Sequence, residues 1–287
     1  MNTLPQHVLS AITYSDYDVP LDEKVISVSS LIDAPHYRKL ALQHKEVQAD
    51  PEDLIVTMFG SIGHSIVERS DHRTIRELRI DHKIRDFVLT GKFDNYDPRT
   101  KILYDNKFVH HKSLDYPSTK LKWEQQMNTY AFLMETEFDW EVKKLVIIVW
   151  IRDMTKMDAV KPDYPDQMVF QVELPLWSYE QQYKYVHERI LYHERYNGLG
   201  CTPYERWATD KAWAVTKKKA FRAYRLFSDK RAAAELLMSL RRKGKKDYRI
   251  EYRAPEDRRC KSCKFKKVCE YALHKELNKY REMLNVK

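Results

Sequence analysis

The run KKLVIIVWI, residues 143–151, restricts the fold of this chain more than any other segment. After its two lysines it is apolar and rich in β-branched residues, a pattern typical of a strand that is buried on both faces of a sheet. Such a strand needs a layer of structure on each side to exclude water. We therefore predict an α/β fold in which helices flank a mixed sheet.

Composition excludes several other classes of protein. Hydrophobic residues make up 43% of the 287 residues, which is enough for a core, and only 6 glycines and 11 prolines are present, which excludes a fibrous or low-complexity chain. No run approaches the roughly 18 apolar residues that a membrane span requires. The N-terminal sequence lacks the charged and apolar regions of a signal peptide. We expect a soluble, intracellular protein.

Periodicity and turn residues predict the order of the elements. Helices are expected over residues 29–44, with Ser29 or Ser30 as the cap, and over 57–69, 118–135 and 176–197. Strands are expected over 75–84, 86–96, 100–109, 143–151 and 167–175, with a hairpin turn at Tyr96–Thr100. A β-β-α-β pattern follows, over residues 211–215, 219–227, 230–243 and 246–254.

Charge divides the chain into two predicted domains, residues 1–200 and 201–287. The second holds 26 lysines and arginines against 11 aspartates and glutamates, a net charge of +15, whereas the net charge of the whole chain is +9. A basic domain beside a mildly acidic one is typical of a protein that binds a polyphosphate, nucleic acid first. A solvated basic surface is the alternative, and charge alone does not decide between the two.

The segment LTGKFDNYDPRTKILYDNKF, residues 89–108, carries the most informative polar residues. Asp94 ends one predicted strand and Asp105 lies in the next, so the tight turn should bring their carboxylates together. Asp105 and Lys107 are two positions apart and share one face of their strand. Two carboxylates that can hold a divalent cation, beside a lysine, are what metal-dependent phosphodiester hydrolysis requires. Taken alone, however, a D-x-K tripeptide is more often a surface ion pair.

The order of four motifs resembles the RecB-like branch of the PD-(D/E)XK nuclease superfamily. The motifs are a histidine on an early helix, G-x-x-D, (D/E)-x-K and Q-x-x-x-Y, and here they consist of His64, Gly91 with Asp94, Asp105 with Lys107, and Gln126 with Tyr130. The resemblance covers residues 29–151. It departs from the family at Asn106 and Phe108, where an apolar residue and a small hydroxyl residue are usual.

The resemblance implies a restriction-endonuclease-like core in residues 1–200 and a role for each motif residue. His64, Asp94, Asp105 and the backbone carbonyl of Asn106 would bind Mg²⁺ or Mn²⁺, and Lys107 would be the catalytic lysine. Gln126 and Tyr130, one helical turn apart, would line the site. Glu68 and Glu77 are candidates for a supporting role near the metal.

The chain's four cysteines, Cys201, Cys260, Cys263 and Cys269, fit a single centre. In an intracellular chain they argue for a tetrathiolate zinc site or a 4Fe–4S cluster rather than for disulfides. The C-x2-C-x5-C spacing is not that of a zinc ribbon. It resembles the iron–sulfur nucleases of the same group, including AddB, the CRISPR-associated four-cysteine exonucleases and phage-encoded members. Those families usually place the lone cysteine early in the chain, where this sequence has Ala34.

The predicted function is therefore that of a Mg²⁺- or Mn²⁺-dependent DNA exonuclease with a 4Fe–4S cluster or, alternatively, Zn²⁺. The resemblance implies phage or bacterial DNA recombination, repair or replication, a cytoplasmic location in the bacterium or phage host, and an annealing protein or helicase as further partner classes. Candidate DNA-binding residues are Lys217, Lys218, Lys219, Arg258, Arg259, Lys264, Lys266 and Lys267. A catalytically silent DNA-binding or recombination scaffold is the main alternative, and a redox sensor built on the cysteines is a third.

Overall fold

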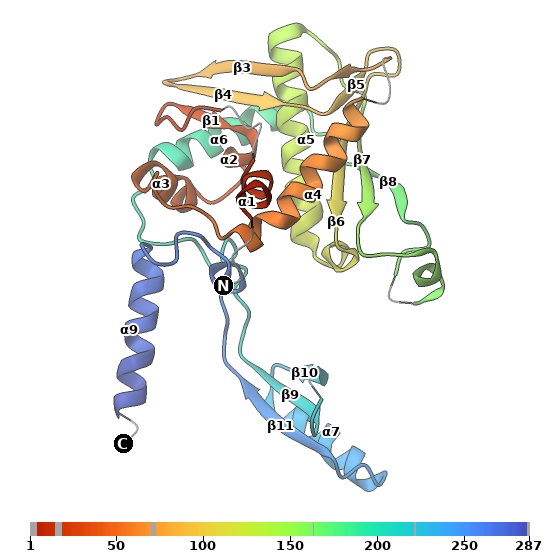
Figure 1. The fold of residues 1–287 in the computed structure, drawn as a ribbon, viewed down its shortest axis with the longest axis vertical. Helices are drawn as coiled ribbons and strands as arrows, with labels where there is room; N and C mark the ends of the chain where they lie inside the picture. The colour runs from red at the N-terminus through yellow and green to blue at the C-terminus, as the bar shows by residue number, and fades with distance from the viewer. Residues whose placement is uncertain (1–4, 15–18, 70–72, 163, 221, 286–287) are drawn as a thin grey trace. The chain divides into compact units, whose positions relative to one another are not determined.

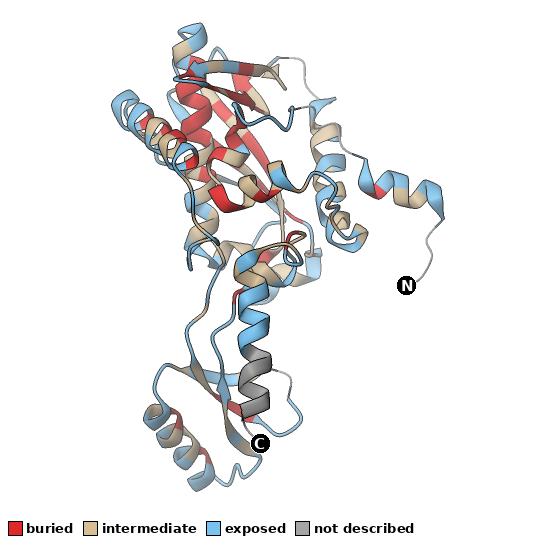
Figure 2. Cartoon of the chain, turned by 90° about the vertical axis from the view of Figure 1, so that its left-hand side faces the viewer, coloured by how far each residue is buried: buried red, intermediate tan, exposed pale blue. Residues whose placement is uncertain are grey.

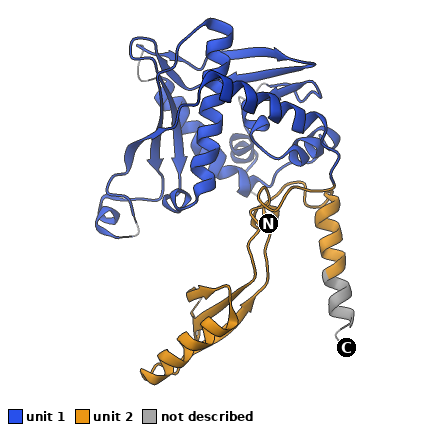
Figure 3. Cartoon of the chain, turned by 180° about the vertical axis from the view of Figure 1, so that it is seen from behind, with its two compact units in different colours: residues 1–198 blue, residues 199–287 orange. Residues whose placement is uncertain are grey.

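The computed structural model describes residues 5–14, 19–69, 73–162, 164–220 and 222–285 (Figure 1). The chain divides into two compact units, residues 1–198 and 199–287 (Figure 3). Among the described residues, no helix is both long enough and apolar enough to cross a membrane.

Unit 1 combines helices with two sheets. Its helices are α1 (Gln6–Thr13), α2 (Val28–Leu31), α3 (Pro35–Gln43), α4 (Pro51–Glu68), α5 (Pro117–Phe138) and α6 (Tyr179–Glu194), with 3-10 turns η1 (His111–Asp115) and η2 (Lys156–Val160). Its strands are β1 (Val25–Ser27), β2 (Ile75–Arg76), β3 (Arg79–Ile84), β4 (Phe87–Lys92), β5 (Asn95–Asp97), β6 (Ile102–Val109), β7 (Lys144–Ile151) and β8 (Val169–Leu174). The expected α/β class with mixed sheets is confirmed.

The larger sheet has the strand order β2-β5-β6-β7-β8, and the smaller one has the order β1-β4-β3. In the larger sheet β6 and β7 are parallel, while the other neighbouring strands are antiparallel. The predicted hairpin is present, since Asn95 pairs with Tyr104 and Asp97 with Ile102. The chain leaves β4 and enters β5 through Phe93 and Asp94, so Asp94 lies where one sheet passes into the other.

Helices α4 and α5 cover opposite faces of β6. Neighbouring side chains of a strand point to opposite faces. Phe108 lies against Gly63 of α4, whereas Lys107 contacts Gln126 of α5. This arrangement places the motif residues of α4, β6 and α5 around one strand.

The apolar run that predicted a fully buried strand forms β7. Leu145, Val146 and Ile147 are each at most 4% exposed, and consecutive buried residues on a strand show that both faces are covered. Figure 2 shows most buried residues within unit 1. The main core includes Leu89, Phe93, Leu103, Met127, Phe132, Leu133, Ile147 and Val186.

Several expected boundaries are wrong. The helix expected over residues 29–44 is two helices, because Pro35 has no N–H to continue α2 and begins α3 instead. The cap is Ser27, whose side chain accepts a hydrogen bond from the Ser30 backbone N–H, rather than Ser29 or Ser30. The strand expected over 75–84 breaks at Glu77, whose φ is 49°, and the strand expected over 86–96 breaks before Asn95.

Unit 2 contains the predicted β-β-α-β pattern. Its elements are β9 (Ala212–Lys217), β10 (Ala223–Phe227), α7 (Lys230–Arg242), β11 (Tyr248–Arg253), α8 (Arg258–Lys261) and α9 (Glu270–Asn285). Neither α8 nor α9 was expected. The sheet has the order β10-β9-β11, and Val215, Ala233 and Leu240 form its core with α7. The segment expected as the second strand includes Phe221, which lies outside the described residues.

Two side chains of α6 hold that helix against the end of α2. Arg189 Nε donates to the Leu31 carbonyl oxygen at 2.8 Å, and His193 Nε2 lies 3.1 Å from the same oxygen. His193 is only 8% exposed. Its burial, together with the Arg189 charge, lowers the pKa of His193 to about 3.

This buried histidine should make stability depend on pH. Folded His193 stays neutral, whereas an unfolded histidine titrates near 6.5, so the unfolded state binds the extra proton as the pH falls. From this group alone, the free energy of unfolding should decrease by about 1 kcal/mol between pH 7 and pH 5.5. Denaturant unfolding at each pH measures the effect. His193→Gln should reduce the slope, and an unchanged slope would contradict the assignment.

Candidate active site

Asp94 receives donors from two directions. The backbone N–H of Asn106 on β6 donates to Asp94 Oδ2 at 2.7 Å. His64 Nδ1 of α4 lies 3.1 Å from the same oxygen. The structure therefore brings the histidine motif and the G-x-x-D motif together, which is necessary if His64 and Asp94 are to bind the same metal ion.

Asp105 and Lys107 form an ion pair inside β6. Lys107 Nζ lies 2.7 Å from Asp105 Oδ2, and Asp105 is 2% exposed. Among the described residues, no donor other than Lys107 approaches this buried oxygen. A buried anionic oxygen of this kind is costly unless a cation completes its surroundings.

Helix α5 extends the site beyond Lys107. Lys107 Nζ donates to Gln126 Oε1 at 2.9 Å, and Gln126 Nε2 donates to the Tyr130 hydroxyl at 3.3 Å. Gln126 and Tyr130 are one turn apart on the helix and therefore share a face. The four sequence motifs thus form one connected set, in which the Asn106 backbone N–H joins Asp94 to the strand that carries Asp105 and Lys107.

Asn106 serves the site through its backbone and its side chain. Its backbone N–H binds Asp94, and its Oδ1 accepts a hydrogen bond from Trp150 Nε1 of β7 at 3.0 Å. Trp150 also stacks on Phe108, with ring centroids 5.4 Å apart. The two residues that depart from the family pattern, Asn106 and Phe108, are therefore both packed against Trp150.

Glu77, which was expected only to support the metal ligands, lies close enough to His64 and Asp94 to be a ligand itself. Ligand atoms of His64, Glu77 and Asp94 all lie within 4.8 Å of one another. The Glu77 backbone N–H donates to the Asp94 carbonyl oxygen at 3.1 Å, and Lys92 Nζ lies 2.5 Å from its carboxylate. Its φ of 49° is uncommon for a residue with a side chain, and such strain is frequent at functional sites. Glu68, the other supporting candidate, ends α4.

Burial and charge shift the pKa values of the site in different directions. Burial raises the pKa of Asp105 to about 6, with the Lys107 charge opposing the shift and the Asp94 charge adding to it. Burial would also raise the pKa of Asp94, but the His64 hydrogen bond and the His64 and Lys107 charges lower it. For His64, burial lowers the pKa, but the Asp94 hydrogen bond and the charges of Asp94 and Asp105 together outweigh it, so the pKa is raised.

These observations fit a divalent cation. The convergent oxygens and imidazole nitrogen of His64, Glu77 and Asp94 are metal donors, and the charges of Asp94 and His64 also act on Asp105. Among the described residues two such groups of three ligand residues occur, and both are in unit 1.

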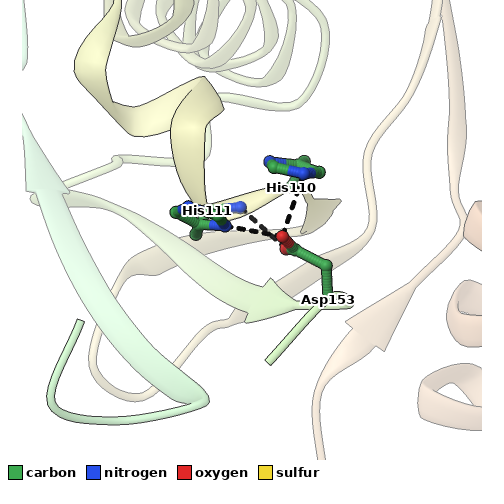
Figure 4. Close-up of side chains that lie close together, drawn as sticks. All are labelled: His110, His111 and Asp153. Atoms are coloured by element: carbon green, nitrogen blue, oxygen red, sulfur yellow. Dashed lines mark hydrogen bonds and ion pairs between the residues drawn. The ribbon is translucent and has the colours of Figure 1, made fainter. Parts of the chain in front are cut away.

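The second group, His110, His111 and Asp153, was not predicted (Figure 4). Asp153 Oδ2 lies 3.0 Å from His110 Nε2 and 2.5 Å from His111 Nδ1, and Asp153 Oδ1 accepts the His111 backbone N–H at 2.8 Å. The Lys112 backbone N–H donates to His110 Nδ1, which leaves the proton of a neutral His110 on Nε2, facing Asp153. Asp153 is thus satisfied by three donors, and the cluster ties the end of β6 to the end of β7.

All four cysteines lie in unit 2 and are partly buried. Burial raises the pKa of Cys201 to about 12, with further contributions from Glu205, Cys260 and Cys269. Burial also raises the pKa of Cys260, with the charges of Asp257 and then Cys263 adding to the shift, and it raises the pKa of Cys263, to which Cys269 adds. The four thiols therefore share one neighbourhood, and their donor set fits a tetrathiolate metal centre.

The candidate DNA-binding residues are distributed over two parts of unit 2. Lys217 ends β9, and Lys218 and Lys219 follow it in an exposed turn. The other five lie in or directly after α8, among the cysteines: Arg258, Arg259, Lys264, Lys266 and Lys267.

The sequence matches no family model and no curated protein. Similar solved structures include SSO0001, with 14% identity over 70% of this chain and 90% of that chain and a TM-score of 0.45. A phage-related exonuclease from Haemophilus somnus 129PT has 14% identity over 67% and 82%, with a TM-score of 0.30. The alkaline exonuclease LHK-Exo from Laribacter hongkongensis has 12% identity over 60% and 88%, with a TM-score of 0.37.

Glycine at position 63 is required for the approach of α4 to β6. A Cβ at Gly63 would lie 2.3 Å from Phe108 Cζ, and Phe108 cannot easily retreat because it stacks on Trp150. Gly63→Ala should therefore displace His64 and weaken Mn²⁺ binding about tenfold, the effect of losing one well-placed ligand contact. Gly60→Ala is the matched control, since nothing lies within 4 Å of its Cβ.

Calorimetric titration with Mn²⁺ measures this effect. Gly60→Ala should bind as the wild type does, and adding Phe108→Leu should restore part of the affinity that Gly63→Ala loses. Equal affinity of both alanine variants would show that the contact does not position His64.

Proposed function

We propose that this protein is a Mg²⁺- or Mn²⁺-dependent deoxyribonuclease that acts as an exonuclease. One observation carries the proposal: Asp105 is fully buried close to a second carboxylate, Asp94, and among the described residues Lys107 is the single donor that approaches its Oδ2. A buried carboxylate pair with an incomplete set of positive partners is the arrangement that a catalytic cation completes.

The cation would be held by His64, Asp94, Asp105 and the backbone carbonyl of Asn106, with Glu77 placed to join them. When bound, such an ion lowers the pKa of a coordinated water and offsets charge on a phosphate. Asp94 is already anionic and aligned by His64 and the Asn106 N–H, so little reorganisation is needed at that ligand.

Lys107 would act on the phosphate and the attacking water. Its Nζ is held between Asp105 Oδ2 and Gln126 Oε1, at 2.7 and 2.9 Å, which leaves one ammonium proton for a further acceptor. A fixed ammonium group can orient water or offset the charge that develops on the phosphate oxygens. Gln126 positions Lys107, and Tyr130 positions Gln126 through their hydrogen bond.

Unit 2 would bind the DNA and carry the cysteine centre. Its net charge of +15 supplies the sequence-independent attraction to phosphates, and Tyr252 and Trp207, both at least half exposed, are available for stacking. Trp213 and Tyr248 pack against the unit's core instead. Cys201, Cys260, Cys263 and Cys269 would hold a 4Fe–4S cluster or, alternatively, Zn²⁺.

The setting that we propose is phage or bacterial DNA recombination, repair or replication in the bacterial cytoplasm. A single-strand annealing protein or a helicase is the partner class that would use such an exonuclease. The motif resemblance supports this setting and this class of partner.

The enzymatic proposal can be tested with end-labelled DNA. Wild-type protein should shorten 5′- and 3′-labelled single- or double-stranded DNA stepwise with Mg²⁺ or Mn²⁺. Lys107→Ala should cleave at least about a hundredfold more slowly while still binding DNA, since one preorganised charge is lost. Lys83→Ala, at an exposed lysine of the same unit, is the matched control.

Equal cleavage by wild type and Lys107→Ala would indicate a contaminating nuclease. DNA binding without cleavage in either metal would favour the catalytically silent scaffold.

The DNA-binding role of unit 2 predicts a change in salt dependence. Replacing Lys217, Lys218 and Lys219 by glutamine should weaken binding and reduce the slope of log K against log salt by up to about 3, one for each lost phosphate contact. The control triple replaces exposed lysines of unit 1, Lys83, Lys143 and Lys156. Fluorescence anisotropy at several salt concentrations measures the slopes, and identical slopes would remove the turn after β9 from the interface.

A further inference from the structure

Asp257 is a buried acid at the centre of the cysteine-bearing segments of unit 2. Asp257 is 9% exposed and lies just before α8, which carries Cys260. The Cys260 backbone N–H donates to the Asp257 carbonyl oxygen at 3.1 Å. The proposed function above does not use this acid.

Each carboxylate oxygen of Asp257 binds a different segment. Arg206 Nε donates to Oδ1 at 3.1 Å, from the segment that follows Cys201. The Tyr271 hydroxyl donates to Oδ2 at 2.9 Å, and Lys275 Nζ binds the same oxygen. Tyr271 and Lys275 belong to α9, which begins directly after Cys269.

Arg206 makes further contacts that close the network. Its guanidinium lies over the Tyr271 ring, 4.0 Å from the centroid, and it also donates to the Cys201 carbonyl oxygen. Its own carbonyl accepts the Arg259 backbone N–H at 3.1 Å. A Cβ at Gly200 would lie 2.7 Å from Tyr271 Cβ, so the backbone beside Cys201 lies directly against α9.

These contacts join three separate stretches of chain, and each stretch carries one or two cysteines. One carboxylate with donors from the first and third stretches fixes both relative to the second. The side chains of Asp257 and Arg206 are 8% and 13% exposed, so loss of either partner would leave a nearly buried charge without its counterpart.

We propose that Asp257 is the positioning residue of the four-cysteine centre: with Arg206, Tyr271 and Lys275 it holds Cys201, Cys260, Cys263 and Cys269 together before any metal is bound. The proposal rests on the cysteine centre put forward above, but it concerns the metal-free chain. Joining the segments that carry the ligands lowers the entropic cost of metal binding, because the loops are already closed.

Alkylation of the thiols in the metal-free, full-length protein tests the proposal. Each cysteine's reaction rate with iodoacetamide is followed by peptide mass spectrometry. Asp257→Asn should speed alkylation of Cys201 and Cys269 about tenfold, because a lost hydrogen bond to a charged group raises the population of open states by roughly that factor. Tyr271→Phe, which removes one donor, should have a smaller effect in the same direction.

Two controls separate positioning from general destabilisation. Glu256→Gln removes the neighbouring acid, which is exposed and forms an ion pair with Lys261, and it should behave as wild type. Leu240→Ala weakens the core of α7 and the sheet without touching the network, and it should leave the thiol rates unchanged. Equal rates in Asp257→Asn and wild type, or an equal increase in Leu240→Ala, would overturn the proposal.

Metal loading separates this proposal from the one on which it rests. After anaerobic loading with iron and sulfide, or with Zn²⁺, wild type should retain metal, Cys263→Ser should not, and Asp257→Asn should lose metal to a chelator about tenfold faster than wild type. If wild type takes up neither metal, the cysteine centre is wrong, and the alkylation rates still decide whether Asp257 holds the thiols together. If Asp257→Asn releases metal at the wild-type rate, the positioning role is wrong.

Discussion

Asp94 and Asp105 place two carboxylates inside one short hairpin, and the cost of burying their charge governs the side chains around them. Asp94 is stabilised by His64 from α4 and by the Asn106 backbone N–H. Asp105 depends on Lys107, which in turn donates to Gln126 of α5. Three elements on both faces of β6 thus converge because the same two charges need partners. Among the described residues only Lys107 approaches Asp105 Oδ2, while the Asp94 charge opposes its ionisation, and this is why a cation accounts for the site better than an internal ion pair does.

The apolar packing behind the site keeps these partners at fixed distances. Gly63 allows α4 to lie on Phe108, Phe108 stacks on Trp150, and the Trp150 indole N–H binds the side chain of Asn106. Since interiors are close-packed, a change of one methyl group at Gly63 is transmitted to the histidine one residue away. Asn106 and Phe108, which differ from the residues usual in the resembled family, therefore both contribute contacts here. These contacts support the acidic residues from the face of β6 opposite to Lys107.

In unit 2, burial likewise acts on ionisable groups, here the cysteine thiols and Asp257. Burial raises the pKa of the Cys201 thiol to about 12, so binding of metal must be strong enough to release its proton. Asp257, in contrast, stays anionic, because burial is outweighed by Lys275, Tyr271 and Arg206. A buried acid with three donors fixes the backbone near the cysteines, whereas the exposed lysines after α8 remain available to phosphates. In the function that we propose, placement of the thiols and attraction of DNA would thus depend on different residues of one short segment.

Local sequence patterns were sufficient to predict several strands and part of the candidate site. The apolar run 143–151 determined β7, the turn residues after Tyr96 determined the hairpin, and a spacing of two on a strand determined that Asp105 and Lys107 share a face. Only the tertiary structure placed Glu77 beside His64 and Asp94, because that contact depends on the pairing of β2 with β5 and on a left-handed residue that no periodicity encodes. It also decided that Asp257 joins Arg206 to α9. Such contacts arise between residues distant in sequence, and their energy comes from burial, which exists only once the chain has folded.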